Sequence, residues 1–211
     1  MLVDKQSGEI FLYQAIGADF WNEGITGETV IQALDSLGGK RAIVRINSPG
    51  GSVWDGIAIY NALKRYPGGV DVVIDSLCAS IASIIALAGE TRTSAKGSMW
   101  MIHRAMSFAY GNQEDVRKTL AMLETGDKTL IGIYADSMPS ETPETIEAKM
   151  SAETWFTAEE AVEVGLATKT DGEAKEKPVA ANWFKHAPES LFKACSAVQS
   201  VPKYRYVSAL R

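Results

Sequence analysis

The sequence predicts an α/β fold with a sheet that is at least partly parallel. β-Rich runs such as "RAIVRIN" and "VDVVID" alternate with segments whose apolar residues have helical spacing, and short turns join them. At 211 residues and 46% hydrophobic content, the chain is long enough for one well-packed domain. Folds of this kind place their functional residues at the ends of strands.

The first half of the chain repeats a strand and a helix. Residues 8–17, "GEIFLYQAIG", predict a strand, and residues 26–39 predict a helix with a threonine cap and a glycine stop. Residues 41–66 repeat the unit, with "SPGGS" as a tight turn between strand and helix. The next strand, at 70–75, leads directly into "SLCASIAS" at 76–83, which we expect to open an apolar helix.

The second half is dominated by one long helix. Residues 98–105, "SMWMIHRA", predict a strand, and about 113–138 predict a helix whose apolar stripe needs a partner. Residues 142–167 predict a short helix, a turn and a helix from Ala158 to Val164 that a glycine ends. The pattern of residues 169–211 assigns no secondary structure to them.

Composition excludes several classes of protein. A formal net charge of -5 without a basic block argues against nucleic-acid binding. The two cysteines, Cys78 and Cys195, have no metal-binding spacing and indicate a reducing compartment such as the cytoplasm. The longest apolar run is too short to span a membrane, and the amino terminus has no leader pattern, so we expect a soluble protein. We expect no metal and no cofactor, since neither a metal site nor a phosphate-binding loop is visible.

The glycines of "SPGGS" are the first candidate for chemistry. Gly50 and Gly51 allow backbone angles and close approaches that residues with a side chain obstruct, so their amides could face a carbonyl oxygen. An ordinary turn is the alternative interpretation.

Ser80 is the better nucleophile candidate in "SLCASIAS". At the first turn of a helix, its hydroxyl lies at the positive end of the helix dipole, whereas Ser76 and Ser83 suit close packing. A serine nucleophile needs a base, and the chain has two histidines. His103 follows the apolar strand "MWMI" and would lie at its end, whereas His186 is in the unpatterned tail. A histidine at the edge of the core is the alternative interpretation of His103.

Four blocks of sequence together resemble the ClpP family of serine proteases. They are "VRINSPGGSVWDGIAIYNAL", "CASIASIIALAG", "SMWMIHRAM" and "TWFTAEEAVEVGLA", in the family's order and within about residues 8–168. The resemblance is closest to phage-encoded ClpP-like head maturation proteases. It implies the ClpP/crotonase fold, a spiral of strand-strand-helix units with a projecting handle at about 106–138. The peptidase domain would then be 1–168, followed by a tail of unknown role at 169–211.

The resemblance also implies roles for individual residues. The nucleophile corresponds to Ser80, the base to His103, and the oxyanion-hole amides to Gly51 and Ile81. The family usually has an aspartate where this chain has Glu153, and a glutamate can also orient an imidazolium.

Other acids are weaker candidates for the third member of the triad. Asp136 is the fallback, although it lies in the predicted long helix, and Glu159 and Glu160 suit the surface of the following helix.

The function that the resemblance implies is a serine endopeptidase in a homo-oligomeric, stacked ring. Its peptidase core would need no ATP, and an ATPase unfoldase is a possible partner. Phage scaffold or capsid proteins are the implied substrates, in the cytoplasm of a bacterium or a phage-infected host.

Three alternatives remain at this stage. A catalytically silent ring subunit is favoured only by Glu153. A crotonase-type acyl-CoA enzyme would share the fold but needs no serine nucleophile. A relative of the signal-peptide peptidases would use a Ser-Lys dyad and a membrane anchor.

Overall fold

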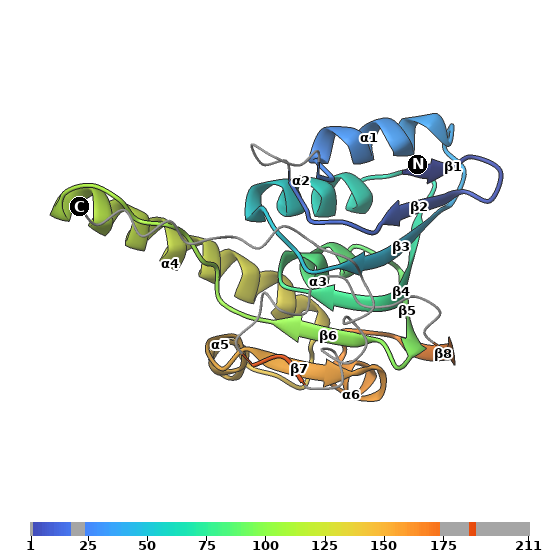
Figure 1. Cartoon of the computed structure of the whole chain (residues 1–211). Helices are drawn as coiled ribbons and strands as arrows, with labels where there is room; N and C mark the ends of the chain where they lie inside the picture. The colour runs from blue at the N-terminus through green and yellow to red at the C-terminus, as the bar shows by residue number, and fades with distance from the viewer. Residues whose placement is uncertain (1, 18–23, 174–185, 189–211) are drawn as a thin grey trace.

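The computed structural model describes residues 2–17, 24–173 and 186–188, and within them a single sheet of eight strands (Figure 1). Six strands follow in the order β1-β2-β3-β4-β5-β8, while β6 pairs with β4 and β7 pairs with β6. The strands are β1 (Val3–Asp4), β2 (Glu9–Leu12), β3 (Ala42–Ser48), β4 (Val70–Ala79), β5 (Thr91–Lys96), β6 (Met99–Ile102), β7 (Thr154–Thr157) and β8 (Lys169–Glu173).

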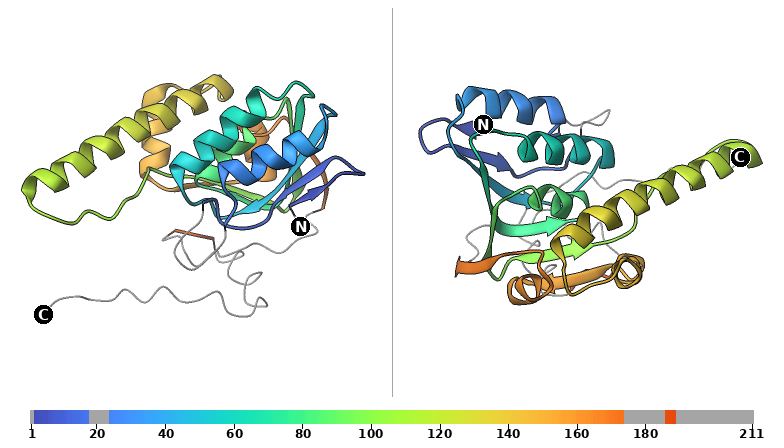
Figure 2. Two further views of the ribbon diagram at one scale, coloured as in Figure 1. Left: turned by 90° about the horizontal axis from the view of Figure 1, so that it is seen from above. Right: turned by 180° about the vertical axis from the view of Figure 1, so that it is seen from behind.

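The helices are α1 (Gly27–Ser36), α2 (Val53–Lys64), α3 (Ile81–Ala86), α4 (Gln113–Ser137), α5 (Pro143–Ser151) and α6 (Ala158–Val164). Helices α1 and α2 lie side by side over one face of the sheet, and α3 packs against α2 (Figure 2). Helix α4 projects from this body as a handle (Figures 1 and 2). No helix among the described residues combines the length and hydropathy that a membrane span needs.

Strand β4 connects the two parts of the sheet. Its first half pairs in parallel with β5 along Asp71–Ile74, and its second half pairs in parallel with β6 along Leu77–Ala79. Strand β3 also runs parallel to β4 on the other side. The carboxyl ends of β3, β4 and β6 therefore meet at one edge, which is where sites form in open α/β sheets.

The predicted fold class is confirmed, and most predicted elements are present. Strand β4 runs to Ala79, however, so "SLCA" is strand, and the helix begins only at Ile81. Strand β5, "TRTSAK", was not predicted because it lacks an apolar alternation, and β7 occupies the predicted turn. Strand β8 extends the sheet to Glu173, five residues past the boundary expected at 168.

A close contact between helices fixes the start of α3. A Cβ atom on Gly56 of α2 would lie 2.1 Å from Cγ1 of Ile81, so only glycine allows this approach. Ile81 is itself buried. Helix α2 therefore holds the first residue of α3 in place through direct packing.

Candidate active site

Three loops at the shared edge of the sheet carry the candidate residues. β3 leads into Gly50 and Gly51, β4 ends immediately before Ser80, and β6 ends immediately before His103. The register pairs Ala79 with Met101, so the ends of β4 and β6 are adjacent. Residues that are 23 or more positions apart in the sequence are thereby brought together.

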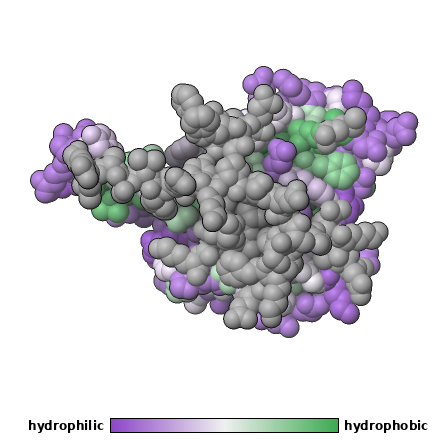
Figure 3. Space-filling model, in the orientation of Figure 1, coloured by the Kyte–Doolittle hydropathy of each residue, from purple (hydrophilic) through white to green (hydrophobic). Residues whose placement is uncertain are grey.

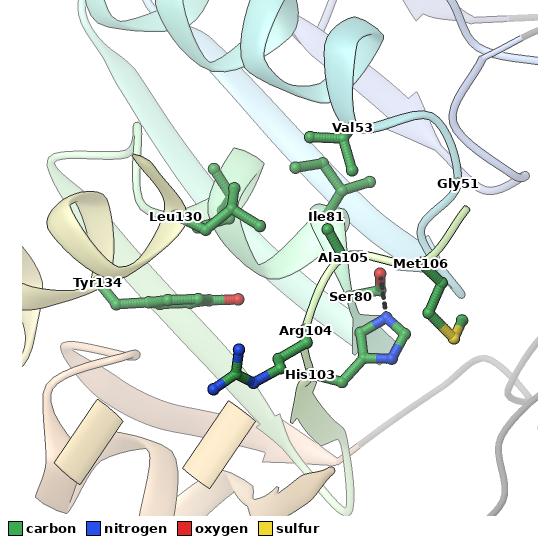
Figure 4. A pocket seen from close by; sticks show the side chains of 11 residues that line it. Gly51, Val53, Ser80, Ile81, His103, Arg104, Ala105, Met106, Leu130 and Tyr134 are labelled. Atoms are coloured by element: carbon green, nitrogen blue, oxygen red, sulfur yellow. Dashed lines mark hydrogen bonds between the residues drawn. The ribbon is translucent and has the colours of Figure 1, made fainter. Parts of the chain in front are cut away.

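Ser80 and His103 are in direct contact. Ser80 Oγ and His103 Nε2 are 2.7 Å apart, within hydrogen-bonding distance (Figure 4). The backbone of Ser80 has φ 57° and ψ -132°, a conformation that residues with a side chain rarely adopt. Such strain occurs where the surrounding structure imposes it, and here the Ser80 amide is held by a 2.9 Å hydrogen bond to the Met101 carbonyl.

The electrostatic surroundings keep His103 neutral near pH 7. Burial lowers the pKa of His103 below its ordinary value of 6.5, and the negative charges of Glu153 and Asp127 oppose this shift. A neutral imidazole can accept a proton from a hydroxyl group, whereas an imidazolium cannot. The pair therefore has the protonation state that a nucleophile and its base require.

Two backbone amides border the same pocket as Ser80 and His103. Gly51 forms a parallel β-bridge with Ile16. The Ile16 amide donates to the Gly50 carbonyl at 2.8 Å, and the Ser52 amide donates to the Ile16 carbonyl at 2.7 Å. In such a bridge the amide of the middle residue, Gly51, points away from Ile16. Ile81 is the first residue of α3, where an amide has no partner within the helix. Both amides are therefore suited to stabilise an oxyanion.

Glu153 lies opposite His103 across the β6–β7 pair. The antiparallel register matches Ile102 with Thr154, so the residues next to them, His103 and Glu153, face each other. Glu153 has a positive φ of 52°. Its Oε1 atom accepts hydrogen bonds from the His186 amide at 2.8 Å and from Trp155 Nε1 at 3.4 Å. A short segment of the tail thus contacts the candidate acid.

The other acids considered from the sequence lie elsewhere. The charge of Asp136 acts on Tyr60 of α2, whose pKa is raised mainly by burial and partly by this carboxylate. Glu160 accepts a hydrogen bond from the Thr157 amide at 2.7 Å and caps α6, and Glu159 is exposed on the same helix. The carboxylates whose charges act on the pKa of His103 are instead those of Glu153 and Asp127.

Asp127 on α4 was not among the residues predicted from the sequence. This buried carboxylate accepts a 2.8 Å hydrogen bond from the Ala105 amide and forms a 3.2 Å ion pair with Arg104. Arg104 and Ala105 are the two residues that follow His103. Arg104 also binds Glu147 of α5 at 2.7 Å. An aspartate within the apolar stripe of a helix was the signal that could have identified it, because such a position is buried.

The pocket beside Ser80 has a largely apolar lining. Val53, Met106, Leu130 and the ring of Tyr134 line it, together with the Arg104 side chain (Figure 4). Ile84 also lines it. Within the described residues, no group of three or more histidine, cysteine, aspartate or glutamate side chains is arranged to hold a metal ion.

An α/β sheet whose strand ends bring together a strained serine, a neutral histidine and two available amides has the architecture of a serine hydrolase. Comparison with known proteins identifies the family of the chain. The family model for Clp protease matches residues 4–171. The chain belongs to the Clp protease family.

Individual relatives agree with this assignment. The ATP-dependent Clp protease proteolytic subunit of Bacteroides fragilis is 34% identical over 136 residues, which cover 63% of this chain and 65% of that protein. The corresponding subunit of Ligilactobacillus salivarius is 31% identical over 164 residues, covering 77% and 80% of the two chains. A mutant of ClpP1 from Listeria monocytogenes has the same fold, with a TM-score of 0.70, 21% identity, and coverage of 80% and 94%.

Proposed function

We propose that this chain is the peptidase subunit of a Clp-type protease and hydrolyses peptide bonds through Ser80. The hydrogen bond of 2.7 Å between Ser80 Oγ and His103 Nε2 carries the proposal. It joins a hydroxyl group at a strained strand-to-helix junction to a histidine that burial keeps neutral. The names of the relatives, which are proteolytic subunits, support the same activity.

The proposed reaction is acyl transfer to the serine. His103 Nε2 removes the Ser80 proton as Oγ attacks the peptide carbonyl carbon, and the Gly51 and Ile81 amides donate hydrogen bonds to the resulting oxyanion. The imidazolium then protonates the leaving amine, and the carbon–nitrogen bond breaks to leave an acyl ester on Ser80. His103 next deprotonates a water molecule that hydrolyses the ester. The negative charge of Glu153 favours the imidazolium in both steps.

The largely apolar lining of the pocket suggests the substrate class. A peptide whose carbonyl lies against Ser80 would place a neighbouring side chain among Ile84, Met106 and Leu130. An apolar side chain at that position buries surface there without leaving a polar group unpaired. We therefore propose cleavage next to apolar residues.

The handle supports the proposal of a homo-oligomeric, stacked ring. Large apolar side chains are exposed on α4 and on the segment that runs along it, namely Met106, Phe108, Tyr110, Val116, Leu120 and Met122. Figure 3 shows hydrophobic colour along the lower edge of the projecting helix. Exposed apolar surface of this extent is typical of an interface.

We propose two kinds of protein partner for the ring. An ATPase unfoldase would unfold protein substrates and deliver them to the ring, in keeping with the ATP dependence in the names of the relatives, while short peptides would need no ATP. Phage scaffold or capsid proteins are the proposed natural substrates, on the strength of the motif resemblance. The assembly would be cytoplasmic, in agreement with the free, buried thiol of Cys78.

Covalent labelling tests the proposed nucleophile. The protein is treated with a fluorophosphonate probe and the adduct is located by peptide mass mapping, with Ser80→Ala as the matched variant. We expect an adduct on Ser80 in the wild type and none in the variant. A correctly assembled oligomer without an adduct would refute the proposal and favour a catalytically silent subunit, the alternative that Glu153 suggests.

The pH dependence of hydrolysis tests the proposed base. Because protonated His103 cannot accept the Ser80 proton, kcat/KM should fall on acidification through the lowered pKa of His103. The midpoint is expected below pH 6.5 in assays of a fluorogenic peptide from pH 5 to 8.

The Glu153→Gln variant tests whether the midpoint of this pH profile belongs to His103. Glu153→Gln removes a negative charge that raises the pKa of His103, so its midpoint should move to still lower pH. A wild-type midpoint above pH 6.5, or one that Glu153→Gln leaves in place, would contradict the assignment.

A further inference from the structure

The junction that carries Ser80 is held by a buried chain of hydroxyl groups that the proposed reaction does not use. Ser83 Oγ donates a 2.6 Å hydrogen bond to the Ser80 carbonyl, and Ser83 Oγ and the Tyr134 hydroxyl oxygen are 2.7 Å apart. Ser83 and Tyr134 have 0% and 1% of their surface exposed. These two hydroxyl groups connect α4, at the base of the handle, to the backbone of the candidate nucleophile.

The direction of the hydrogen bonds follows from the number of protons. The Ser83 hydroxyl has one proton, and a carbonyl oxygen can only accept, so that proton goes to the Ser80 carbonyl. Tyr134 must therefore donate to Ser83 in the second hydrogen bond. Burial raises the pKa of Tyr134, which keeps its hydroxyl protonated over the working range of the protein.

The position of the chain matters because Ser80 is strained. Its φ of 57° places the hydroxyl toward His103, and the Ser80 carbonyl accepts two hydrogen bonds, from Ser83 Oγ at 2.6 Å and from the Ser83 amide at 3.0 Å. A backbone in a sparsely populated conformation persists only when its surroundings hold it there. Without the donor from Tyr134, the Ser83 oxygen loses the partner that fixes its position and polarises its hydroxyl group, so its hydrogen bond to the Ser80 carbonyl weakens.

We propose that Tyr134 is a positioning residue, which through Ser83 holds Ser80 in the conformation that meets His103. The inference rests on the proposed function of Ser80. It also links the base of α4, through two side-chain hydroxyl groups, to the backbone that carries the nucleophile.

Kinetics of Tyr134→Phe provide the first test. The ring, which lines the pocket, is kept and only the hydroxyl group is lost, so KM should be unchanged. The value of kcat for a fluorogenic peptide, and the rate of fluorophosphonate labelling, should fall about ten- to a hundredfold, the effect of a small misplacement of a reacting group.

Two comparisons separate this role from a general loss of stability. Tyr66→Phe is the matched control, since the Tyr66 hydroxyl donates a 2.8 Å hydrogen bond to the Lys40 carbonyl far from the site, and we expect no change in kcat. Ser83→Ala should lower kcat as Tyr134→Phe does, and the double variant should be no slower than Ser83→Ala, because both changes break one chain. Effects that multiply in the double variant, or an unchanged kcat in Tyr134→Phe with only a lower Tm, would overturn the proposal.

Crystal structures of the wild type and Tyr134→Phe give a result that does not depend on activity. We expect the variant to lose the φ of about 57° at Ser80, and Ser80 Oγ to leave hydrogen-bonding distance of His103 Nε2. Unchanged geometry in the variant would overturn the inference even if the wild type proves inactive. An inactive wild type whose variant shows the expected displacement would instead refute only the proposed function.

Discussion

Replacing His103 with alanine is expected to reduce kcat for peptide hydrolysis by a factor on the order of 10⁶, the effect of losing the catalytic histidine in subtilisin. The reason is that Ser80 Oγ loses the acceptor that lies 2.7 Å away, and no second histidine contacts it among the described residues. The loss should appear in kcat rather than in KM, because the imidazole acts on the reacting atoms. Steady-state kinetics with a fluorogenic peptide measure both quantities.

The same substitution at the other histidine provides the control. His186→Ala keeps the backbone amide that donates to Glu153, so its activity should match that of the wild type. Circular dichroism and size-exclusion chromatography establish that both variants fold and assemble. Removal of a catalytic base lowers kcat far more than about a hundredfold. If His103→Ala retained more than about one hundredth of the wild-type kcat, another group would therefore have to be the base.

Replacing Gly51 with alanine is expected to lower kcat at least about a hundredfold, the typical effect of losing one oxyanion donor. A Cβ atom at this position would lie 2.1 Å from the Ile16 carbonyl oxygen, so the loop must move and take the Gly51 amide with it. The residue also has φ 147°, which disfavours a side chain. Kinetics and the rate of fluorophosphonate labelling should decline together.

Gly38→Ala is the matched control for backbone strain. Gly38 has a positive φ of 61°, but an added Cβ atom would have no neighbour within 4 Å. Gly38→Ala should therefore lose only the stability that a left-handed backbone costs a residue with a side chain, on the order of 1 kcal/mol, and keep its activity, whereas Gly51→Ala adds the clash with Ile16 and should lose activity. A kcat for Gly51→Ala within tenfold of the wild type would mean that this amide does not bind the oxyanion.

The surroundings of Glu153 bear on its proposed role as the acid that faces His103. The antiparallel register of β6 and β7 places it opposite His103, and its backbone has a positive φ of 52°. The His186 amide and Trp155 Nε1 hold its Oε1 atom. These donors orient the carboxylate, whose negative charge raises the pKa of His103 against the effect of burial.

Local patterns were sufficient to predict the elements with strong periodicity. The turn "SPGGS", the strand before His103 and the helix α4 were each expected within a few residues of their observed bounds, because their apolar residues or glycines follow a regular spacing. Strand β5 has no such pattern, because its side chains are partly exposed and it forms through pairing with β4 and β8. The end of β4 at Ala79 likewise depends on pairing with β6.

The sequence by itself determined the α/β class, the family and the identity of Ser80, His103 and Gly51 as candidates, because motifs and periodicity are properties of neighbouring residues. Only the tertiary structure decided that Ser80 and His103 meet at 2.7 Å, that Asp127 binds the segment after His103, and that Tyr134 reaches Ser80 through Ser83. These contacts join residues of different elements. They depend on strand register and on the packing of α4 against the body, which no local pattern encodes.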